Sequence, residues 1–345
     1  MRKHGKFLII TLIIFTAFWI HFWWFCLHSS SRRNDNGEVV YVKSGLSTGE
    51  IADLLKEKRL LKHKLYFLLL SKIYRVEERM KAGEYLFTKK MNILNILHLL
   101  KKGMVLTHPV VIPEGYNVWQ IAETLEGKEI VSSFSFLEGS NDKALCSQMN
   151  IEADSVEGYL FPDTYFLAKN MNPRQIIPLM VNRFHEMLPK NAKRLARARN
   201  MSLHEIVILA SLIEKETSDK KEMPTIAAVF YNRLRKGMPL QCDPTVLYAL
   251  GKVRKRLTRK DLSINSPYNT YRYRGLPPGP IANPGRAAIK AALRPNEFDY
   301  LYFVSKNNGT HYFSKTLSEH NSAVFKYQIK GQIGDSSDKE SAVKK

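Results

Sequence analysis

The chain has little of what marks several protein classes. Its 345 residues include three cysteines, Cys26, Cys146 and Cys242, which are too few and too irregularly spaced for a disulfide framework. The sequence contains no ligand spacing typical of a metal site, no glycine-rich phosphate loop and no Gly-x-Ser-x-Gly motif. These absences argue against a metalloenzyme, a nucleotide-dependent enzyme and an α/β-hydrolase, so we expect neither a metal nor a cofactor.

Acidic residues are scarce relative to basic ones. The chain has 32 Asp and Glu against 53 Lys and Arg, which gives a net charge of +21. The positive charge is spread along the chain and is not interleaved with aromatic residues on one element, so we expect no nucleic-acid partner. Anionic lipid and acidic polymers remain as partners that this charge would attract.

One long hydrophobic run occurs, at residues 7–27, and His21 is its only ionisable residue. A helix of this length covers about 30 Å, the thickness of the hydrocarbon core of a membrane. A cleaved signal peptide is the alternative, although its apolar region is usually shorter, about 7–15 residues. We predict a single transmembrane helix at 7–27, preceded by a cytoplasmic N-terminus at 1–6 and followed by a polar tether at 28–37.

A strand–turn–helix pattern occurs twice, at residues 40–55 and 110–125. Each copy has a short apolar run, a glycine, and a Ser or Asn followed three residues later by Glu or Gln, which is the signature of a helix capping box. We predict that residues 38–149 form a small α+β module with an associated segment.

The pattern changes at about residue 150 to long amphipathic helices and loops rich in proline and aromatic residues. We predict a mixed α+β domain over 150–330 and a disordered tail at 331–345. The expected helices lie at 173–196, 202–215 and 224–236, and a hairpin is expected around the Asn-Asn-Gly turn at 307–309. The predicted fold class is therefore α+β.

Residues 157–165 place two carboxylates and three aromatic rings around a glycine and a proline. Aromatic faces and hydrogen-bonding carboxylates suit a sugar, which offers C–H faces and hydroxyl edges. Glu157, Tyr159 and Asp163 are therefore candidate binding residues. A buried loop whose polar groups are satisfied internally explains the same residues equally well.

An almost wholly apolar helix at 206–213 ends in Glu214 and Glu216. A carboxyl at the edge of a core is desolvated, which raises its pKa as a general acid near neutral pH requires. The two glutamates lie about 200° apart on a helix, so only one of them can serve a given site. Glu214 shares its face with small residues, whereas Glu216 has Lys220 four residues later, typical of a surface ion pair. The helical wheel favours Glu214 only mildly.

Two later loops also carry candidate binding residues. Gln241 and Asp243 follow the helix predicted at 224–236, although Asp243 stands before a proline and is explained as well by capping of the next helix. Tyr268, Asn269 and Tyr271 lie in a rigid Pro/Gly-rich segment, and their side chains again suit a carbohydrate.

Four motifs taken together closely resemble the YceG-like family of endolytic murein transglycosylases. They are E-G-Y-L-F-P-D-T-Y, L-A-S-L-I-E-K-E-T, Y-N-R-L…G-M-P-L-Q-C-D-P-T-V and S-P-Y-N-T-Y…G-L-P-P-G-P-I-A-N-P-G. The resemblance covers essentially the whole chain. It implies a LysM-like subdomain in the first half and a catalytic domain in the second half, on the outer face of the cytoplasmic (inner) membrane.

The resemblance implies that Glu214 is the catalytic acid. It further implies cleavage of the β-1,4 bond between N-acetylmuramic acid and N-acetylglucosamine within peptidoglycan strands, with 1,6-anhydro ends as products. Since the substrate's own 6-hydroxyl then replaces water, one carboxyl performs both proton transfers and the second carboxylate of ordinary glycosidases is not needed. Termination of strand elongation and partners such as penicillin-binding proteins are implied by the same resemblance.

Cys242 departs from the family pattern, in which we expect a small hydroxyl residue in the L-Q-x-D-P-T segment. Two alternative functions also stay open at this point. One is a non-catalytic peptidoglycan-binding scaffold that recruits wall enzymes, and the other is a hydrolase with the same cleft.

Overall fold

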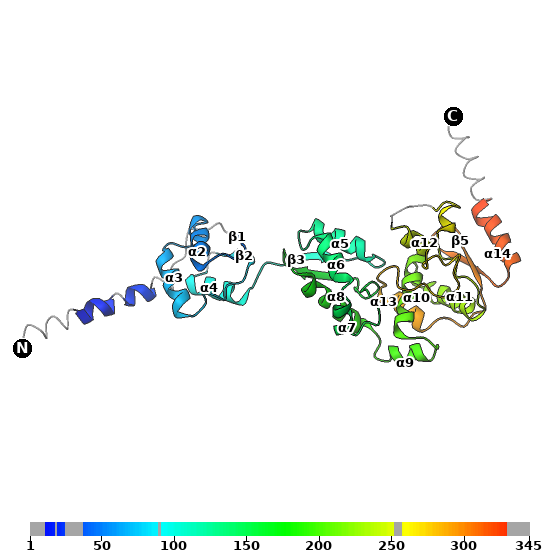
Figure 1. Ribbon diagram of the computed structural model, residues 1–345, viewed down its shortest axis with the longest axis horizontal. Helices are drawn as coiled ribbons and strands as arrows, with labels where there is room; N and C mark the ends of the chain where they lie inside the picture. Colours follow the sequence, from blue (N-terminus) through cyan, green and yellow to red (C-terminus); the bar gives the residue numbers. More distant parts are fainter. Residues whose placement is uncertain (1–10, 18, 25–36, 89–90, 252–256, 330–345) are drawn as a thin grey trace, which may run out of the picture. The chain divides into compact units, whose positions relative to one another are not determined.

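The computed structural model describes residues 11–17, 19–24, 37–88, 91–251 and 257–329 (Figure 1). The described chain combines helices with three two-stranded sheets, so the predicted α+β class is confirmed. It divides into two compact units. Unit 1 contains the described residues up to His108 together with Phe166–Asn170, and unit 2 contains Pro109–Tyr165 and the described residues from Met171 onward.

The predicted transmembrane helix is contradicted. Within the part of the chain that the structure describes, no helix combines the length and apolarity needed to cross a membrane. The described helical stretches of the hydrophobic run are 11–17 and 19–24, whereas a span needs about 20 consecutive apolar residues. The ring of Phe22 is buried and lies 5.2 Å from that of Tyr66, so this apolar side chain packs on unit 1. The rest of the run, residues 1–6, most of the predicted tether and the tail at 331–345 lie outside the described residues.

Unit 1 is built from two strands and three helices around one hydrophobic core. The elements are β1 (Glu38–Val42), α2 (Thr48–Glu57), α3 (Lys64–Ile73), β2 (Gly83–Phe87) and α4 (Ile93–Lys102). β1 and β2 pair antiparallel, with Val40 opposite Tyr85. The apolar faces of all five elements meet in the core, whose largest buried side chains include Leu55, Phe67, Leu70, Tyr85 and Phe87.

Unit 2 is mainly helical. Its elements, with the strand β3 that leads into it, are β3 (His108–Val111), α5 (Val118–Gly127), α6 (Ser133–Ser140), α7 (Lys143–Gln148), β4 (Thr164–Leu167), α8 (Pro173–Met187), α9 (Ala192–Arg197), α10 (Leu203–Glu216), α11 (Met223–Arg235), α12 (Asp243–Ala249), η1 (Asp261–Ser263), α13 (Arg286–Leu293), β5 (Tyr302–Ser305), β6 (His311–Ser314), α14 (Leu317–Val324) and η2 (Phe325–Ile329). α10 is its central helix, since every residue from Ile206 to Ile213 is buried, and it packs against α11 and α13.

The two predicted strand–turn–helix copies are confirmed as β1–α2 and β3–α5. Both helices begin with a complete capping box, formed by Ser47 with Glu50 and by Asn117 with Gln120. α2 belongs to unit 1 and α5 to unit 2, and residues 109–149 group with the second unit. The assignment of the halves as LysM-like and catalytic stays a prediction.

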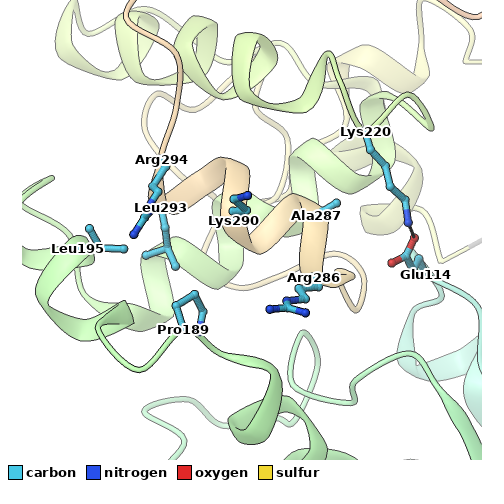
Figure 2. Close-up of a pocket in the computed structure, with 9 residues that line it drawn as sticks. All are labelled: Glu114, Pro189, Leu195, Lys220, Arg286, Ala287, Lys290, Leu293 and Arg294. Carbon is cyan, nitrogen blue, oxygen red and sulfur yellow. Dashed lines mark ion pairs between the residues drawn. The ribbon is translucent and has the colours of Figure 1, made fainter.

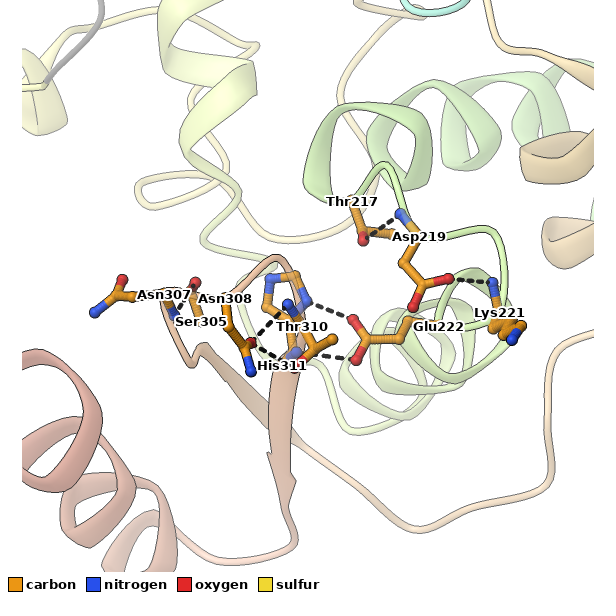
Figure 3. A network of polar contacts seen from close by, with 9 residues as sticks. All are labelled: Thr217, Asp219, Lys221, Glu222, Ser305, Asn307, Asn308, Thr310 and His311. Atoms are coloured by element: carbon orange, nitrogen blue, oxygen red, sulfur yellow. Dashed lines mark hydrogen bonds and ion pairs between the residues drawn. The ribbon is translucent and has the colours of Figure 1, made fainter.

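The predicted hairpin is also confirmed, and it fixes the start of α11. β5 and β6 pair antiparallel around a turn in which Asn307 has a φ of 62°. The Glu222 carboxylate, immediately before α11, accepts hydrogen bonds from the His311 backbone N–H (2.9 Å) and lies 2.7 Å from the ring nitrogen Nδ1 of that histidine (Figure 3). These contacts attach the C-terminal hairpin to the helices that carry the candidate site.

Candidate active site

Glu214 lies in the last turn of α10, where the buried helix reaches the edge of the core. Its Oε2 accepts a hydrogen bond from the backbone N–H of Gly285, at 2.9 Å. Burial raises the pKa of this carboxyl, nearby Glu114 raises it further, and the bond from Gly285 opposes both effects. A raised pKa favours the protonated carboxyl, and the Gly285 N–H can stabilise the carboxylate, two properties that a general acid needs.

Two glycines allow other groups to approach Glu214. Gly115 has a φ of +78°, in the left-handed region that favours glycine, and a β carbon there would lie 3.4 Å from Glu214 Cγ. A β carbon on Gly285 would collide with the Glu114 carboxylate. Glu114 forms an ion pair of 3.0 Å with Lys220, so Glu214 is flanked by an acid–base pair on the same side of the helix end.

Asn283 connects the loops around Glu214. Its side chain donates to the Tyr116 carbonyl at 3.0 Å and to Glu157 Oε1 at 2.8 Å, and it accepts from the Leu160 N–H at 2.8 Å. Gly115 N–H donates in turn to the Asn283 carbonyl, at 3.0 Å. These bonds hold the 115–118, 157–160 and 283–285 segments together, so Asn283 sets the position of Gly285 and hence of the donor to Glu214.

Glu157 is buried, and both of its carboxylate oxygens are used within the protein. Oε2 accepts from the Val118 backbone N–H at 2.9 Å and from the Tyr248 hydroxyl at 3.4 Å, and Oε1 accepts from Asn283. Burial raises its pKa to about 7 despite these bonds. The structure therefore places Glu157 behind the loops around Glu214. Its predicted contact with substrate stays a prediction.

A row of aromatic rings lies beside these loops. The Tyr248 ring is 5.0 Å from that of Trp119 and 5.0 Å from that of Tyr268. Trp119 is exposed and Tyr268 is partly buried, so the row reaches from the Glu157 cluster to the surface. The rings are tilted against one another, by 43° and 44°. The predicted contact of Tyr268 with a sugar stays a prediction.

Glu216 faces a different environment from Glu214. Its carboxylate accepts a hydrogen bond from the Cys242 thiol, and burial raises its pKa to about 7. The predicted surface ion pair with Lys220 is wrong. α10 ends at Glu216, because Thr217 has extended backbone (φ −149°, ψ 143°), so Lys220 lies beyond the helix and pairs with Glu114.

The remaining loop candidates gather near Glu216. Asp243, at the start of α12, accepts a hydrogen bond from the Tyr271 hydroxyl, and Tyr271 N–H donates to Asn269 Oδ1 at 3.0 Å. Asn269 is buried and also donates to two backbone carbonyls. Gln241, which is exposed and has a φ of 51°, donates its N–H to the Thr270 carbonyl at 3.1 Å. Gln241, Asp243, Asn269 and Tyr271 thus form one cluster.

Tyr159 and Asp163 make their contacts in other parts of unit 2. The Tyr159 ring is buried and stacked with His204, and its hydroxyl lies 2.7 Å from His204 Nδ1. Asp163 forms an ion pair of 2.7 Å with Arg183 and accepts from the Thr164 N–H, bonds that lower the pKa of its carboxyl. Both residues therefore have structural explanations, and their predicted contact with substrate is not tested by these contacts.

A basic pocket of about 470 Å³ adjoins the Glu214 end of α10. Figure 2 shows three cationic side chains along α13, facing apolar residues of the segment around α9. The residues that line the pocket are Glu114, Pro189, Leu195, Lys220, Arg286, Ala287, Lys290, Leu293 and Arg294.

Sequence reasoning did not assign a role in the site to Glu114, Tyr248, Asn283 or Gly285, nor to the three cations of α13. Arg286, Lys290 and Arg294 recur at every fourth position, and this spacing indicates a cluster of cations along a helix. No local pattern marked Asn283, because its partners lie 123 to 167 residues away along the chain.

Known proteins resemble this chain in sequence and in fold. The YceG-like family model matches residues 40–326, so the chain belongs to this family. It is 38% identical over 304 residues to the endolytic murein transglycosylase of Bacillus subtilis (strain 168), covering 84% of both chains. It is 30% identical over 361 residues to that of Streptococcus pneumoniae serotype 2, covering 93% of this chain and 65% of the relative.

A solved structure is similar as well. The 2.6 Å crystal structure of a YceG-like protein from Listeria monocytogenes is 35% identical, with a TM-score of 0.58, and the match covers 84% of this chain and 100% of that one. The resemblance found in the four sequence motifs is therefore confirmed.

Proposed function

We propose that this chain is an endolytic murein transglycosylase that cuts the β-1,4 bond between N-acetylmuramic acid and N-acetylglucosamine within peptidoglycan strands. The names of its relatives support this reaction class. The observation that carries the residue assignment is Glu214, a partly buried carboxyl with a raised pKa that faces the Gly285 N–H beside an open pocket.

In the proposed reaction, protonated Glu214 donates its proton to the glycosidic oxygen as the bond from C1 of N-acetylmuramic acid to that oxygen breaks. The Gly285 N–H stabilises the carboxylate that results, since this bond lowers the pKa of Glu214. The carboxylate then takes the proton from the sugar's 6-hydroxyl as that oxygen bonds to C1. The product end is a 1,6-anhydro sugar, and Glu214 ends the cycle protonated.

A single carboxyl is sufficient for this reaction because the nucleophile belongs to the substrate, whereas hydrolysis needs a second carboxylate to activate water or attack C1. The position of Glu216 supports this assignment. Its carboxylate is held by Cys242 near Asp243 and Arg233, at the other side of the helix end. The aromatic row at Trp119, Tyr248 and Tyr268 would supply stacking faces for the strand.

The cellular role follows from the reaction. Cuts inside new strands would end their elongation, so we propose strand termination as the biological outcome, in cooperation with wall-synthesis enzymes such as penicillin-binding proteins. The body would work outside the cytoplasm, where murein lies.

The test is a digest of purified peptidoglycan sacculi with wild type and with Glu214→Gln, followed by mass spectrometry of the released ends. We expect anhydro ends with wild type and about 10²–10⁴-fold fewer with Glu214→Gln, although both proteins should melt at the same temperature within a few degrees. Ends that carry added water would show a hydrolase instead. Binding of strands without any cleavage by wild type would show a non-catalytic scaffold.

A further inference from the structure

The pocket beside Glu214 carries an uncompensated positive charge. Four cationic side chains line it, Lys220, Arg286, Lys290 and Arg294, against the single carboxylate of Glu114. Glu114 is already paired with Lys220. Among the described residues, no acidic side chain forms an ion pair with any of the other three cations. The pocket therefore presents three unpaired positive charges to whatever occupies it.

The three cations form one row because of their spacing. Four residues correspond to about 400° of helix rotation, so Arg286 and Lys290 fall on one face of α13, and Arg294 follows as the residue that ends the helix (φ −137°, ψ 67°) (Figure 2). The opposite face of α13 is buried against α10 and α11, through residues such as Ala288, Ile289 and Ala292. Burial of the opposite face therefore fixes the direction of Arg286 and Lys290, and Arg294 adjoins them at the C-terminal end of α13.

A purely structural account does not explain the row. Like charges four residues apart destabilise a helix by about 0.2–0.5 kcal/mol per pair. Lys290 and Arg294 gain some compensation near the C-terminus of α13, where the helix dipole favours cations. Arg286 is the first residue of α13, at the end that disfavours positive charge. A ligand with negative charges would compensate all three residues.

The other lining residues indicate what kind of anion fits. Pro189 and Leu195 give the pocket an apolar side across from α13, and Leu293 of α13 itself also lines the pocket. The row from Arg286 to Arg294 spans about 12 Å, which matches an extended peptide of about four residues. A short peptide with free carboxylates and aliphatic side chains complements both sides of the pocket, whereas a phosphate polymer has no apolar part to place against Leu195.

We propose that this basic groove (Arg286, Lys290 and Arg294 with the apolar side opposite) binds the acidic peptide carried by the murein strand. The inference rests on the proposed function, because murein peptides are attached to the N-acetylmuramic acid whose bond is cut. The chain geometry places the groove next to that bond. Gly285 donates to Glu214, and Arg286, which begins the row, is the next residue.

The experiment uses full-length chain carrying Glu214→Gln, so that strands bind without being cut. Dissociation constants are measured for fluorescent glycan strands with their peptides and for strands from which an amidase has removed them. The groove variant adds Arg286→Gln, Lys290→Gln and Arg294→Gln. The matched control adds Arg197→Gln, Lys236→Gln and Lys326→Gln, which remove the same charge from exposed positions that do not line the pocket.

We expect the unsubstituted groove to prefer peptide-bearing strands, and the groove variant to reduce that preference about 10-fold, since each exposed charge pair contributes a few-fold. The control should keep the preference. Three results would overturn the proposal: no preference in the parent chain, the same loss in the control, or a groove variant that loses only affinity for short polyphosphate, used as a phosphate-polymer probe.

Failure of the proposed function would look different. The sacculus digest would then give no anhydro ends with the Glu214 protein, whatever the groove binds. A peptide preference that depends on the groove, together with an inactive wild type, would retain the groove as a peptide site and reject the transglycosylase reaction.

Discussion

Glu214 and Glu216 stand two residues apart on the same helix and meet opposite surroundings. Glu214 accepts a hydrogen bond from the Gly285 backbone N–H, and the next residue, Arg286, lines a basic pocket. Glu216 is enclosed by Cys242 and lies near Asp243, Arg233 and His311. Burial raises the pKa of both carboxyls, so a raised pKa alone does not identify a catalytic acid. The two side chains differ in their neighbours, and our proposal assigns the acid to Glu214, which the Gly285 N–H contacts.

Replacing each glutamate with glutamine tests this comparison most directly. The loss of activity in Glu214→Gln should be larger than the effect of any other single substitution. We expect Glu214→Gln to reduce formation of anhydro ends by about 10²–10⁴-fold, because the amide has no proton to donate. Glu216→Gln should retain most of the activity. The release of anhydro-ended fragments from sacculi measures the activity of both variants. Equal losses would contradict different roles for Glu214 and Glu216.

The loops around Glu214 should depend on the hydrogen bonds of the Asn283 side chain. Asn283→Ala removes donors to Glu157 and Tyr116 and the acceptor of the Leu160 N–H, and leaves a buried carboxyl without one of its partners. We expect a loss of about 2–4 kcal/mol in the free energy of unfolding. Urea titration at neutral pH measures it.

Asn296→Ala is the matched control, because Asn296 is exposed and its side chain donates to the Thr225 hydroxyl in a hydrogen bond that solvent can reach. It should change the free energy of unfolding by less than about 1 kcal/mol. A similar value for both asparagines would mean that Asn283 does not hold the loops around Glu214.

Titration of the Glu216 carboxyl should make the stability of the protein depend on pH. Its folded pKa of about 7 lies above the ordinary value near 4.3, so folding favours the protonated form. This contribution is complete below about pH 4.3 and is lost as pH rises through 7. Glu216→Gln does not titrate, so its stability relative to wild type should rise by about 2 kcal/mol between pH 5 and pH 8.

Melting temperatures across this pH range check the prediction. Glu157 also has a pKa of about 7 and remains in the variant, so part of the pH dependence should persist. A wild-type profile and a Glu216→Gln profile that run parallel would show that Glu216 is exposed to solvent rather than enclosed.

Cys242→Ser should give the smallest effect. A hydroxyl is a stronger hydrogen-bond donor than a thiol, so it should stabilise the Glu216 carboxylate and lower its pKa. We expect stability at pH 7 to change by less than about 1 kcal/mol, because Ser and Cys have nearly the same shape. In the serine variant, the decline of stability with rising pH should be smaller and should end at a lower pH. A larger decline that ends at a higher pH would contradict the bond between Cys242 and Glu216.

Features that depend on neighbouring residues were predictable from the sequence. The capping boxes at Ser47 and Asn117 and the turn at Asn307 involve groups within a few residues, and all three form as expected. Glu214 could be chosen over Glu216 only through the family resemblance, because the helical wheel does not show which side of a helix end stays open.

Features that depend on distant residues were not predictable. Glu157 meets Asn283 across 126 residues, and Cys242 meets Glu216 from a separate loop. The transmembrane prediction was wrong because it relied on composition, whereas the structure packs Phe22 against Tyr66. The predicted ion pair between Glu216 and Lys220 was wrong because side chains four residues apart meet only within a continuous helix, and α10 ends at Glu216.

The attachment of the C-terminal hairpin has a consequence for synthesis of the protein. α11 carries the buried polar side chains of Asn232 and Arg233. Arg233 donates to the Leu240 carbonyl close by in the sequence. The later partners of the two side chains are the carbonyl groups of Phe298, Tyr300 and Leu301, and Glu222 at the start of the helix bonds to His311. A nascent chain that has left the ribosome only as far as α13 holds Glu214 and Gly285 but lacks these partners. The helix beside α10 is therefore completed last, and a cutting activity that depends on it should arise only once nearly the whole chain has been made.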